Sequence, residues 1–183
     1  MSYPSWSYYP RNVRPSAWAT DLVAAASTAR LSIDTAGSPV AGVSRKSDAI
    51  LAHLRPGLEI LGYQVESGKS TAEKITRPVL FGNDGKAEVS YDIDAFHDDL
   101  GIAVEVEAGR GASNGADYRD IVRTSLLLDA NYLALFMPIC YHYQLKGKPQ
   151  ITSAHLNTGR QLNAIYASQR LQLPFDGILL IGY

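Results

Sequence analysis

Apolar residues recur along this chain with two different spacings, and these spacings predict its helices and strands. Between 44 and 61 they return every three or four residues and form one stripe, which predicts an amphipathic helix that Pro56 should kink or split. The stripe consists of Ile50, Leu51, Leu54, Leu58 and Leu61. Shorter apolar runs bounded by turn residues predict strands instead.

The predicted elements alternate along the whole chain. Helices are expected at about 16–31, 44–61, 115–129 and 157–171, and strands at about 75–81, 87–94, 102–107, 132–137 and 177–182. Residues 1–14 are rich in tyrosine and proline and are expected to form an irregular N-terminal arm. From the second helix onward the order is helix, three strands, helix, strand. This order predicts an α/β (α+β) fold with a central mixed sheet flanked by helices.

The segment 91–110 carries the most informative polar pattern. It predicts a hairpin that brings Asp94 on one strand beside Glu105 and Glu107 on the next. Residues two apart on a strand share a face, so the two glutamates point the same way, opposite the apolar positions of 102–106. Carboxylates crowded on a buried face repel one another, and a divalent cation such as Mg²⁺ or Mn²⁺ removes that penalty. The alternative interpretation is an ordinary solvated sheet face.

The residues that follow this strand are suited to contact a phosphate. The glycine-rich loop 108–115 lets the backbone approach a ligand closely, and it contains Arg110 and Asn114. Arg119 and Arg123 lie four residues apart on one face of the next predicted helix. We expect these four side chains to contact nucleic acid, although the two helix arginines are equally suited to surface ion pairs with neighbouring carboxylates.

The spacing of Asp94 and Glu105-Val106-Glu107 resembles the metal-binding motif of the PD-(D/E)XK nuclease superfamily, the restriction endonuclease-like proteins. In that motif a lone aspartate precedes an acidic residue, any residue and usually a lysine. Here Glu107 occupies the lysine position, which resembles the BamHI type of restriction endonuclease, with the BglII type as a near relative.

The resemblance implies a fold, an activity and a set of roles. The fold is an αβββαβ core, and the activity is Mg²⁺-dependent (or Mn²⁺-dependent) hydrolysis of DNA phosphodiester bonds. Asp94 and Glu105 would be the metal ligands, and Glu107 would replace the lysine as the group that holds or deprotonates the attacking water. An acidic residue of the first core helix often joins the metal shell in this superfamily, and Glu59 is the better match there, with Glu66 as the other candidate.

Composition limits these interpretations. With 183 residues, of which 46% are apolar, the chain is expected to form a single domain over 1–183. A net charge of −1 gives no general attraction to DNA, so DNA binding would require a local basic patch. The single cysteine excludes an internal disulfide. Because no apolar run reaches the ~20 residues of a membrane span and the N-terminus does not resemble a signal peptide, a cytoplasmic protein is predicted.

Two other functions and the oligomeric state stay open at this point. A catalytically inactive module of the nuclease fold could bind nucleic acid or a protein partner, and paired carboxylates also suit a glycoside hydrolase. A homodimer would give two sites for two DNA strands. The apolar strand 177–182 could mediate it if that strand lies at a sheet edge; the other possibility is that this strand is buried within the monomer's own sheet.

Overall fold

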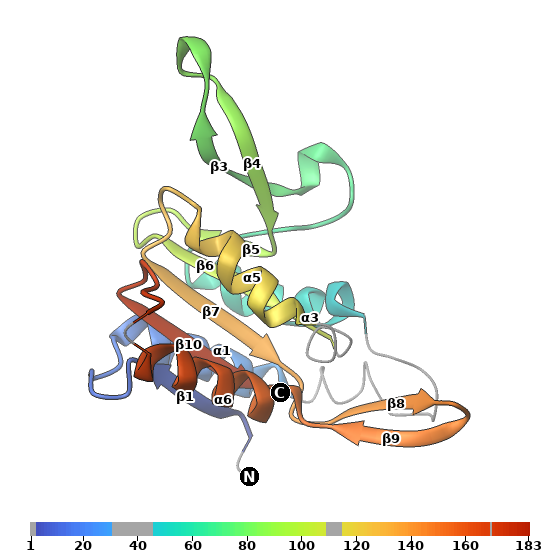
Figure 1. Ribbon diagram of the computed structural model, residues 1–183. Helices are drawn as coiled ribbons and strands as arrows, with labels where there is room; N and C mark the ends of the chain where they lie inside the picture. The colour runs from blue at the N-terminus through green and yellow to red at the C-terminus, as the bar shows by residue number, and fades with distance from the viewer. Residues whose placement is uncertain (1–2, 31–45, 109–114, 169) are drawn as a thin grey trace.

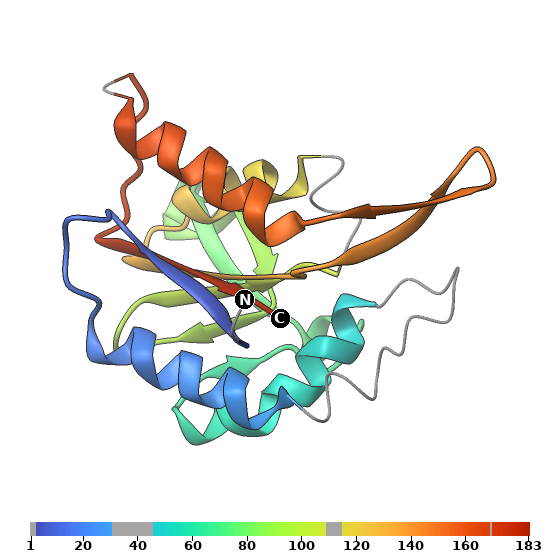
Figure 2. The same cartoon turned by 90° about the horizontal axis from the view of Figure 1, so that it is seen from below.

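The computed structural model describes residues 3–30, 46–108, 115–168 and 170–183, and it has a mixed α/β architecture. A central sheet lies between two layers of helices (Figures 1 and 2). The helices are α1 (Ala17–Thr28), α3 (Ser47–Ile60), α5 (Ala116–Ser125) and α6 (Ala154–Ala167). Viewed along the sheet, α1 and α3 cover one face, and α5 and α6 cover the other (Figure 2). The predicted α/β class, with a mixed sheet flanked by helices, is confirmed.

The central sheet has six strands in the order β1-β10-β7-β6-β5-β2. Their bounds are β1 (Ser5–Tyr9), β10 (Gly177–Gly182), β7 (Tyr132–Met137), β6 (Ile102–Val106), β5 (Ala95–His97) and β2 (Gln64–Val65). Strands β10, β7 and β6 are parallel to one another, whereas β1, β5 and β2 pair antiparallel with their neighbours. Parallel neighbours need a crossover, and α5 makes the one from β6 to β7.

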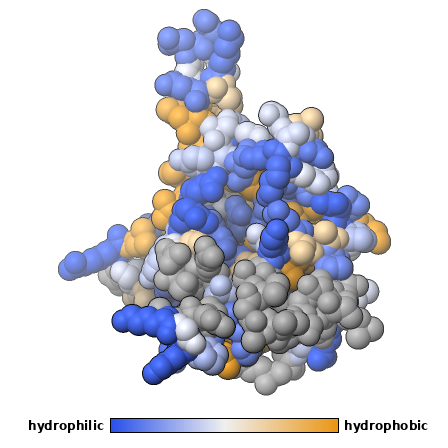
Figure 3. Space-filling view, turned by 90° about the vertical axis from the view of Figure 1, so that its right-hand side faces the viewer, coloured by the Kyte–Doolittle hydropathy of each residue, from blue (hydrophilic) through white to orange (hydrophobic). Residues whose placement is uncertain are grey.

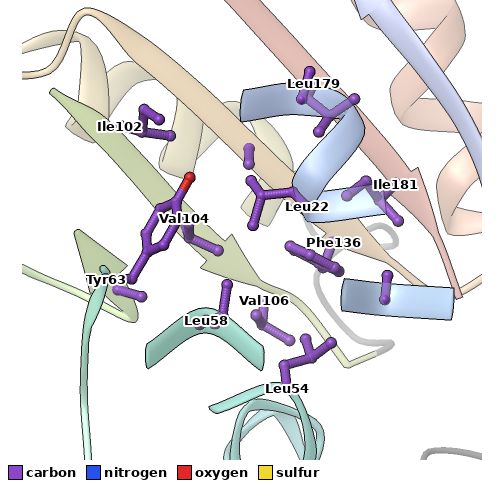
Figure 4. Packing of buried hydrophobic residues seen from close by; sticks show 14 of the residues in the cluster. Leu22, Leu54, Leu58, Tyr63, Ile102, Val104, Val106, Phe136, Leu179 and Ile181 are labelled. Carbon is purple, nitrogen blue, oxygen red and sulfur yellow. The ribbon is translucent and has the colours of Figure 1, made fainter. Parts of the chain in front are cut away.

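Strand alternation divides the apolar side chains between two cores. Ile102, Val104 and Val106 of β6 pack toward α1 and α3, where they meet side chains such as Leu22 and Leu54 (Figure 4). Residues of the opposite parity, such as Ala103, pack toward α5 and α6. Each large apolar side chain buried in this way contributes about 1.5–3 kcal/mol of transfer free energy. The prediction that the apolar residues of 102–106 share one face of the strand is therefore confirmed.

The strands predicted at 75–81 and 87–94 form, but they do not join the central sheet. β3 (Ile75–Phe81) and β4 (Ala87–Ile93) pair only with each other and stand out from the body as a hairpin (Figure 1). The chain then bends at Asp94, and the short strand β5 pairs with β6 instead. Of the three consecutive strands expected at 75–81, 87–94 and 102–107, only the third belongs to the central sheet, where β2 and β5 take the places of the other two between α3 and β6.

The N-terminal arm differs from expectation, whereas the C-terminal strand follows one of the two alternatives given for it. The predicted irregular arm contains β1, an edge strand that places Tyr8 and Tyr9 in the core. This strand covers β10, so the C-terminal strand is not at an edge: it pairs with β1 on one side and β7 on the other, and all six of its residues are buried. The alternative of burial within the monomer's own sheet is the correct one, and a dimer through this strand is excluded.

The remaining elements are short or peripheral. A second hairpin, β8 (Tyr141–Leu145) and β9 (Lys148–Thr152), projects from the body after β7, and two 3₁₀ turns cover Thr71–Glu73 and Asn83–Gly85. The helix predicted at 157–171 begins earlier, after Ser153, whose hydroxyl accepts a hydrogen bond from the Leu156 amide and so caps the helix. No helix in the described ranges is long and apolar enough to cross a membrane.

Candidate active site

Asp94 lies where the β5–β6 ladder ends. The last pair of this ladder joins Ala95 to Val104. Beyond it, the Val106 amide donates a hydrogen bond of 2.7 Å to Asp94 Oδ2, so the Asp94 side chain takes the place of a backbone acceptor. On its other side, the Asp94 carbonyl accepts a hydrogen bond of 2.8 Å from the Glu66 amide, directly after β2. Asp94 is thus held by its backbone and its side chain between two strands.

Glu105 and Glu107 lie on the face of β6 that is turned toward α5. This follows from strand alternation, because Ala103, two residues before Glu105, packs in the core against α5 and α6. The backbone of Glu107 continues the line of β6, since its amide donates to the Phe136 carbonyl at 2.9 Å and its carbonyl accepts from the Tyr183 hydroxyl at 2.6 Å. The structure therefore brings together the three acidic residues predicted from the hairpin pattern.

Helix α5 adds a fourth carboxylate, which the sequence analysis did not assign to the site. Asp120 is buried, with only 3% of its surface exposed. The Arg119 guanidinium contacts Asp120 Oδ1 at 3.2 Å and Glu107 Oε1 at 3.2 Å, so it links the helix to the end of β6. Within the described part of the chain, the buried Asp120 Oδ2 has no hydrogen-bond donor.

The electrostatics of this group are those of carboxylates that repel one another in a low-dielectric setting. Burial raises the pKa of Asp94 to about 7, against the opposing hydrogen bond from Val106 and with added repulsion from nearby carboxylates, Glu66 first. Burial also raises the pKa of Glu105 well above its usual range, and the charge of Asp94 adds to the shift. A full set of negative charges is therefore unfavourable here without a cation.

Glu107 is shifted in the same direction for a related reason. Burial raises its pKa to about 8, and the neighbouring Asp120, which can share a proton with it, contributes next, while Arg119 opposes the shift. The Glu107 carboxylate is consequently a stronger base than an ordinary carboxylate. A group with such a pKa is suited to accept a proton from a water molecule.

The acidic residues of α3 and of the segment after β2 influence the pKa of Asp94 differently from what was expected. The charges of Glu66 and Asp48 act on Asp94, whereas Glu59 does not figure among its main influences. Glu59 is exposed near the C-terminal end of α3, eleven residues after Asp48, which corresponds to about 16 Å along the helix axis. The structure thus leaves Glu59 apart from Asp94 and places Glu66 and Asp48 nearer to it.

A basic residue lies on this acidic side of the site. The Lys69 ammonium contacts Asp48 at 2.8 Å and Glu66 at 3.5 Å. Arg55 donates to the Glu66 carbonyl at 2.7 Å, and all four residues line one pocket of about 250 Å³ between α3 and the segment after β2. Lys69 is therefore the ammonium group closest to the acidic residues beside Asp94, although it belongs to a different segment from the lysine of the motif.

The residues expected to bind nucleic acid fall into two groups. Arg110 and Asn114 lie outside the described residues. Arg119 is 58% exposed while it holds Glu107, and Arg123 donates to the Asp92 carbonyl at 3.3 Å with its guanidinium 4.9 Å from the centre of the Tyr91 ring. Both helix arginines therefore have intramolecular partners, and Arg119 also faces solvent.

Asp92 shows that strand position alone does not define the site. It lies two residues before Asp94, but its carboxylate is bound by Lys74 and by the Thr76 hydroxyl, at 2.8 Å for the latter. The hydrogen bond from Lys74 is the main reason that its pKa is lowered. Asp92 is thus a neutralised residue of the hairpin, and Lys74 is engaged there.

The donor set suits a hard divalent cation. Mg²⁺ is commonly held by one or two carboxylates, with water completing its shell, so Asp94 and Glu105 together would suffice. Across the described residues, no three carboxylate, imidazole or thiol groups already converge on one point where they could hold a metal ion. An ion held by two carboxylates and water would not require such a group.

No protein-family model matches the chain, and no curated protein matches it significantly. The resemblance to the nuclease superfamily consequently depends on the residues of the motif and their setting.

In the view from the side toward which β6 and β7 run, hydrophilic side chains gather below the β3–β4 hairpin (Figure 3).

The sequence does contain a signal for Asp120, which is the occurrence of polar residues on the apolar face of a predicted helix. The buried face of α5 is formed by Ala116, Asp117, Asp120, Ile121 and Thr124. Three of these five residues are polar, on the same helical face as Ile121, and polar groups on a buried helix face need partners. Asp117 finds one in the Thr158 hydroxyl at 2.8 Å, which leaves Asp120 as the acidic residue available to the site.

Proposed function

We propose that this protein is a metal-dependent endodeoxyribonuclease, a phosphodiesterase that hydrolyses the DNA backbone. The observation that carries the proposal is that Asp94, Glu105 and Glu107 of the predicted motif and the buried Asp120 are close enough to repel one another, in a setting that raises the pKa of each of the three motif carboxyls. Such a cluster of shifted carboxyls is more typical of functional sites than of structural ones.

Asp94 and Glu105 would hold the divalent ion. When bound, the ion supplies charge neutralisation for the scissile phosphate and activates a water molecule as nucleophile. The hydrogen bond from the Val106 amide fixes the Asp94 carboxylate, so one ligand is already oriented before the ion arrives. This preorganisation supports the assignment of Asp94 as a ligand.

Glu107 would act as the general base. In the reaction a water oxygen forms a new bond to phosphorus while the bond from phosphorus to the leaving sugar oxygen breaks. Glu107 takes the proton of the attacking water, and solvent protonates the leaving oxygen. Arg119 orients the Glu107 carboxylate through the contact of 3.2 Å and, being largely exposed, can also approach a phosphate.

Nicking of supercoiled plasmid DNA tests this function. We expect conversion to the open circle, because a single site cleaves one strand. This conversion should require Mg²⁺ or Mn²⁺ and should not occur in EDTA. Glu105→Gln, which keeps the shape of the side chain and removes its charge, should reduce the rate by at least about 10³-fold, a loss typical of removing one transition-state interaction. Asp92→Asn is the matched control, because Asp92 is bound to Lys74 outside the site.

Two outcomes would contradict the proposal. Nicking that persists in Glu105→Gln would originate from another site or another protein. Stable, EDTA-insensitive DNA binding without cleavage would instead favour the inactive binding module of the same fold.

A further inference from the structure

A small cavity on the opposite side of the sheet from Glu105 contains polar groups that the acidic site does not use. It has a volume of about 170 Å³ and lies between the start of α1, the end of α3 and the turn after β5. Trp18 and Tyr63, two of its lining residues, are 8% and 5% exposed. Both belong to the core between the sheet and the helices α1 and α3, whereas Glu105 faces α5.

Three buried polar atoms at this cavity lack partners. Neither Trp18 Nε1, nor the Tyr63 hydroxyl, nor His97 Nδ1 has a hydrogen-bond partner among the residues that the structure describes. Figure 4 shows the Tyr63 hydroxyl reaching in among apolar side chains, near Ile102 and Leu22. Leaving one such buried group unpaired costs about 1–3 kcal/mol, so three at one cavity indicate that something occupies it.

The lining residues define what that occupant must offer. The Trp18 indole can only donate, so the occupant needs an acceptor there. Asp21, which is exposed at the rim of the cavity and acts on the Tyr63 hydroxyl through its charge, can only accept, so the occupant also needs a donor. The rings of Tyr63 and His97 pack edge to face with their centroids 5.1 Å apart, so part of the cavity wall is aromatic, and an aromatic wall favours an aromatic ligand.

Size and polarity argue against water alone. If each non-hydrogen atom takes roughly 20–30 Å³, close to the share of a water molecule in the liquid, the cavity holds about six to eight such atoms. The wall also includes the apolar side chains of Leu61 and Leu100, which offer water no hydrogen bonds. A single ring with one polar edge satisfies both parts of the wall.

We propose that this cavity binds a single-ring heterocycle with adjacent C=O and N–H groups, as in a pyrimidine base. One C=O accepts from the Trp18 indole, the N–H donates to Asp21, and the second C=O of a pyrimidine such as uracil accepts from the Tyr63 hydroxyl, with His97 at the wall. His97 and Asp94 lie at opposite ends of β5, about 10 Å apart along the strand, so the cavity is a second site. This proposal does not depend on the proposed nuclease activity.

Uracil is the probe, and the two tryptophan indole N–H signals of ¹⁵N-labelled full-length protein are the readout. Trp6 and Trp18 are the only tryptophans, and Trp6 lies on β1 and does not line the cavity. Uracil should shift the Trp18 signal saturably and leave the Trp6 signal in place. 1,3-Dimethyluracil, which has no N–H group, should bind about tenfold more weakly or worse, because Asp21 then loses its donor.

Two variants test the same Asp21 contact by changing the protein instead of the ligand. Asp21→Asn should weaken uracil binding about tenfold, whereas Asp84→Asn, an equivalent change at the tip of the β3–β4 hairpin, should leave it unchanged. The proposal is overturned if uracil at its solubility limit does not move the Trp18 signal, which would mean that the cavity holds only water. It is also overturned if toluene and dimethyluracil bind as well as uracil, because the cavity would then be merely apolar. Both ligand comparisons use the wild-type chain and so do not depend on the folding of any variant.

Discussion

At the scale of single residues, Glu105 has opposite effects on folding and on the proposed activity. Its carboxylate is crowded by Asp94 and Asp120 in a buried setting, so its charged form opposes folding in the absence of a cation. The same crowding gives the site its affinity for a divalent ion. A residue that destabilises the fold while it serves a ligand is typical of functional sites.

Glu105→Gln should therefore raise stability and abolish metal binding together. In EDTA at pH 8 we expect the free energy of unfolding to increase by about 0.5–2 kcal/mol, the usual gain from relieving one unfavourable residue. Chemical denaturation measures this change. A loss of stability in Glu105→Gln would mean that the Glu105 carboxylate has a structural partner, and the interpretation of the cluster as a cation site would fail.

The sequence indicated these carboxylates only in part, for a physical reason. Strand periodicity and the hairpin turn are local properties of the sequence. They predict that Glu105 and Glu107 share a face and that Asp94 lies beside them on the neighbouring strand. Asp120 reaches the site only because α5 packs against β6, and that packing depends on distant residues. Glu59 was preferred over Glu66 from its position on the helix, but the helix presents Asp48 rather than Glu59 to the end of β5.

At the scale of elements, α5 positions Asp120 and Arg119, and its own position is fixed by α6. The Asp117 carboxylate accepts hydrogen bonds from the Thr158 hydroxyl of α6 at 2.8 Å and from the Tyr118 amide at 3.0 Å. Asp117 and Thr158 have no exposed surface. This buried contact joins the two helices on the side of the sheet that carries Glu105.

Thr158→Val should separate stability from activity. Valine keeps the shape of threonine but removes the donor to Asp117 Oδ2, which leaves that buried oxygen unpaired, so we expect a loss of about 1–3 kcal/mol in the free energy of unfolding. Metal-dependent nicking should persist at temperatures where the variant is folded, since Thr158 does not contact the acidic cluster. A variant that keeps full stability would show that the Thr158 hydroxyl does not hold α5 in place.

Element prediction failed where pairing partners had to be chosen. The runs at 75–81 and 87–94 have strand periodicity, and both form strands, but periodicity does not specify which strand pairs with which. β3 and β4 pair only with each other, and Arg77 fixes the base of their hairpin, with its guanidinium 4.0 Å from the centre of the Phe96 ring and in contact with Asp98 and Asp129. These contacts join residues far apart in the chain, which no local pattern records.

At the scale of the whole molecule, the acidic cluster couples stability to pH and to divalent cations. The pKa values of Asp94 and Glu107 are raised in the folded protein to about 7 and about 8, whereas unfolded carboxyls titrate near ~4. Between these values the folded state binds more protons than the unfolded state, so the contribution of these groups to stability falls as pH rises. Glu105 acts in the same direction.

In EDTA, the free energy of unfolding contributed by these groups should therefore decline from about pH 5 to pH 8. Mg²⁺ should restore it at pH 8 and have little effect at pH 5, where protons compete for the same carboxyls; at 100 times its dissociation constant the ion would add about 2.7 kcal/mol. Thermal unfolding across this pH range measures both effects, and Glu105→Gln should show a flatter profile. Stability that rises with pH by the same amount in wild type and Glu105→Gln would exclude the cluster as its source.

Calorimetric titration of the metal-free protein with Mn²⁺ tests the central claim most directly. We expect saturable binding in the wild type, loss of that binding in Asp94→Ala, and unchanged binding in Asp92→Ala, because Asp92 is two residues away but bound to Lys74. If the wild type does not bind Mn²⁺, or if Asp94→Ala binds it as tightly as Asp92→Ala does, the carboxylates of this sheet do not form a metal site.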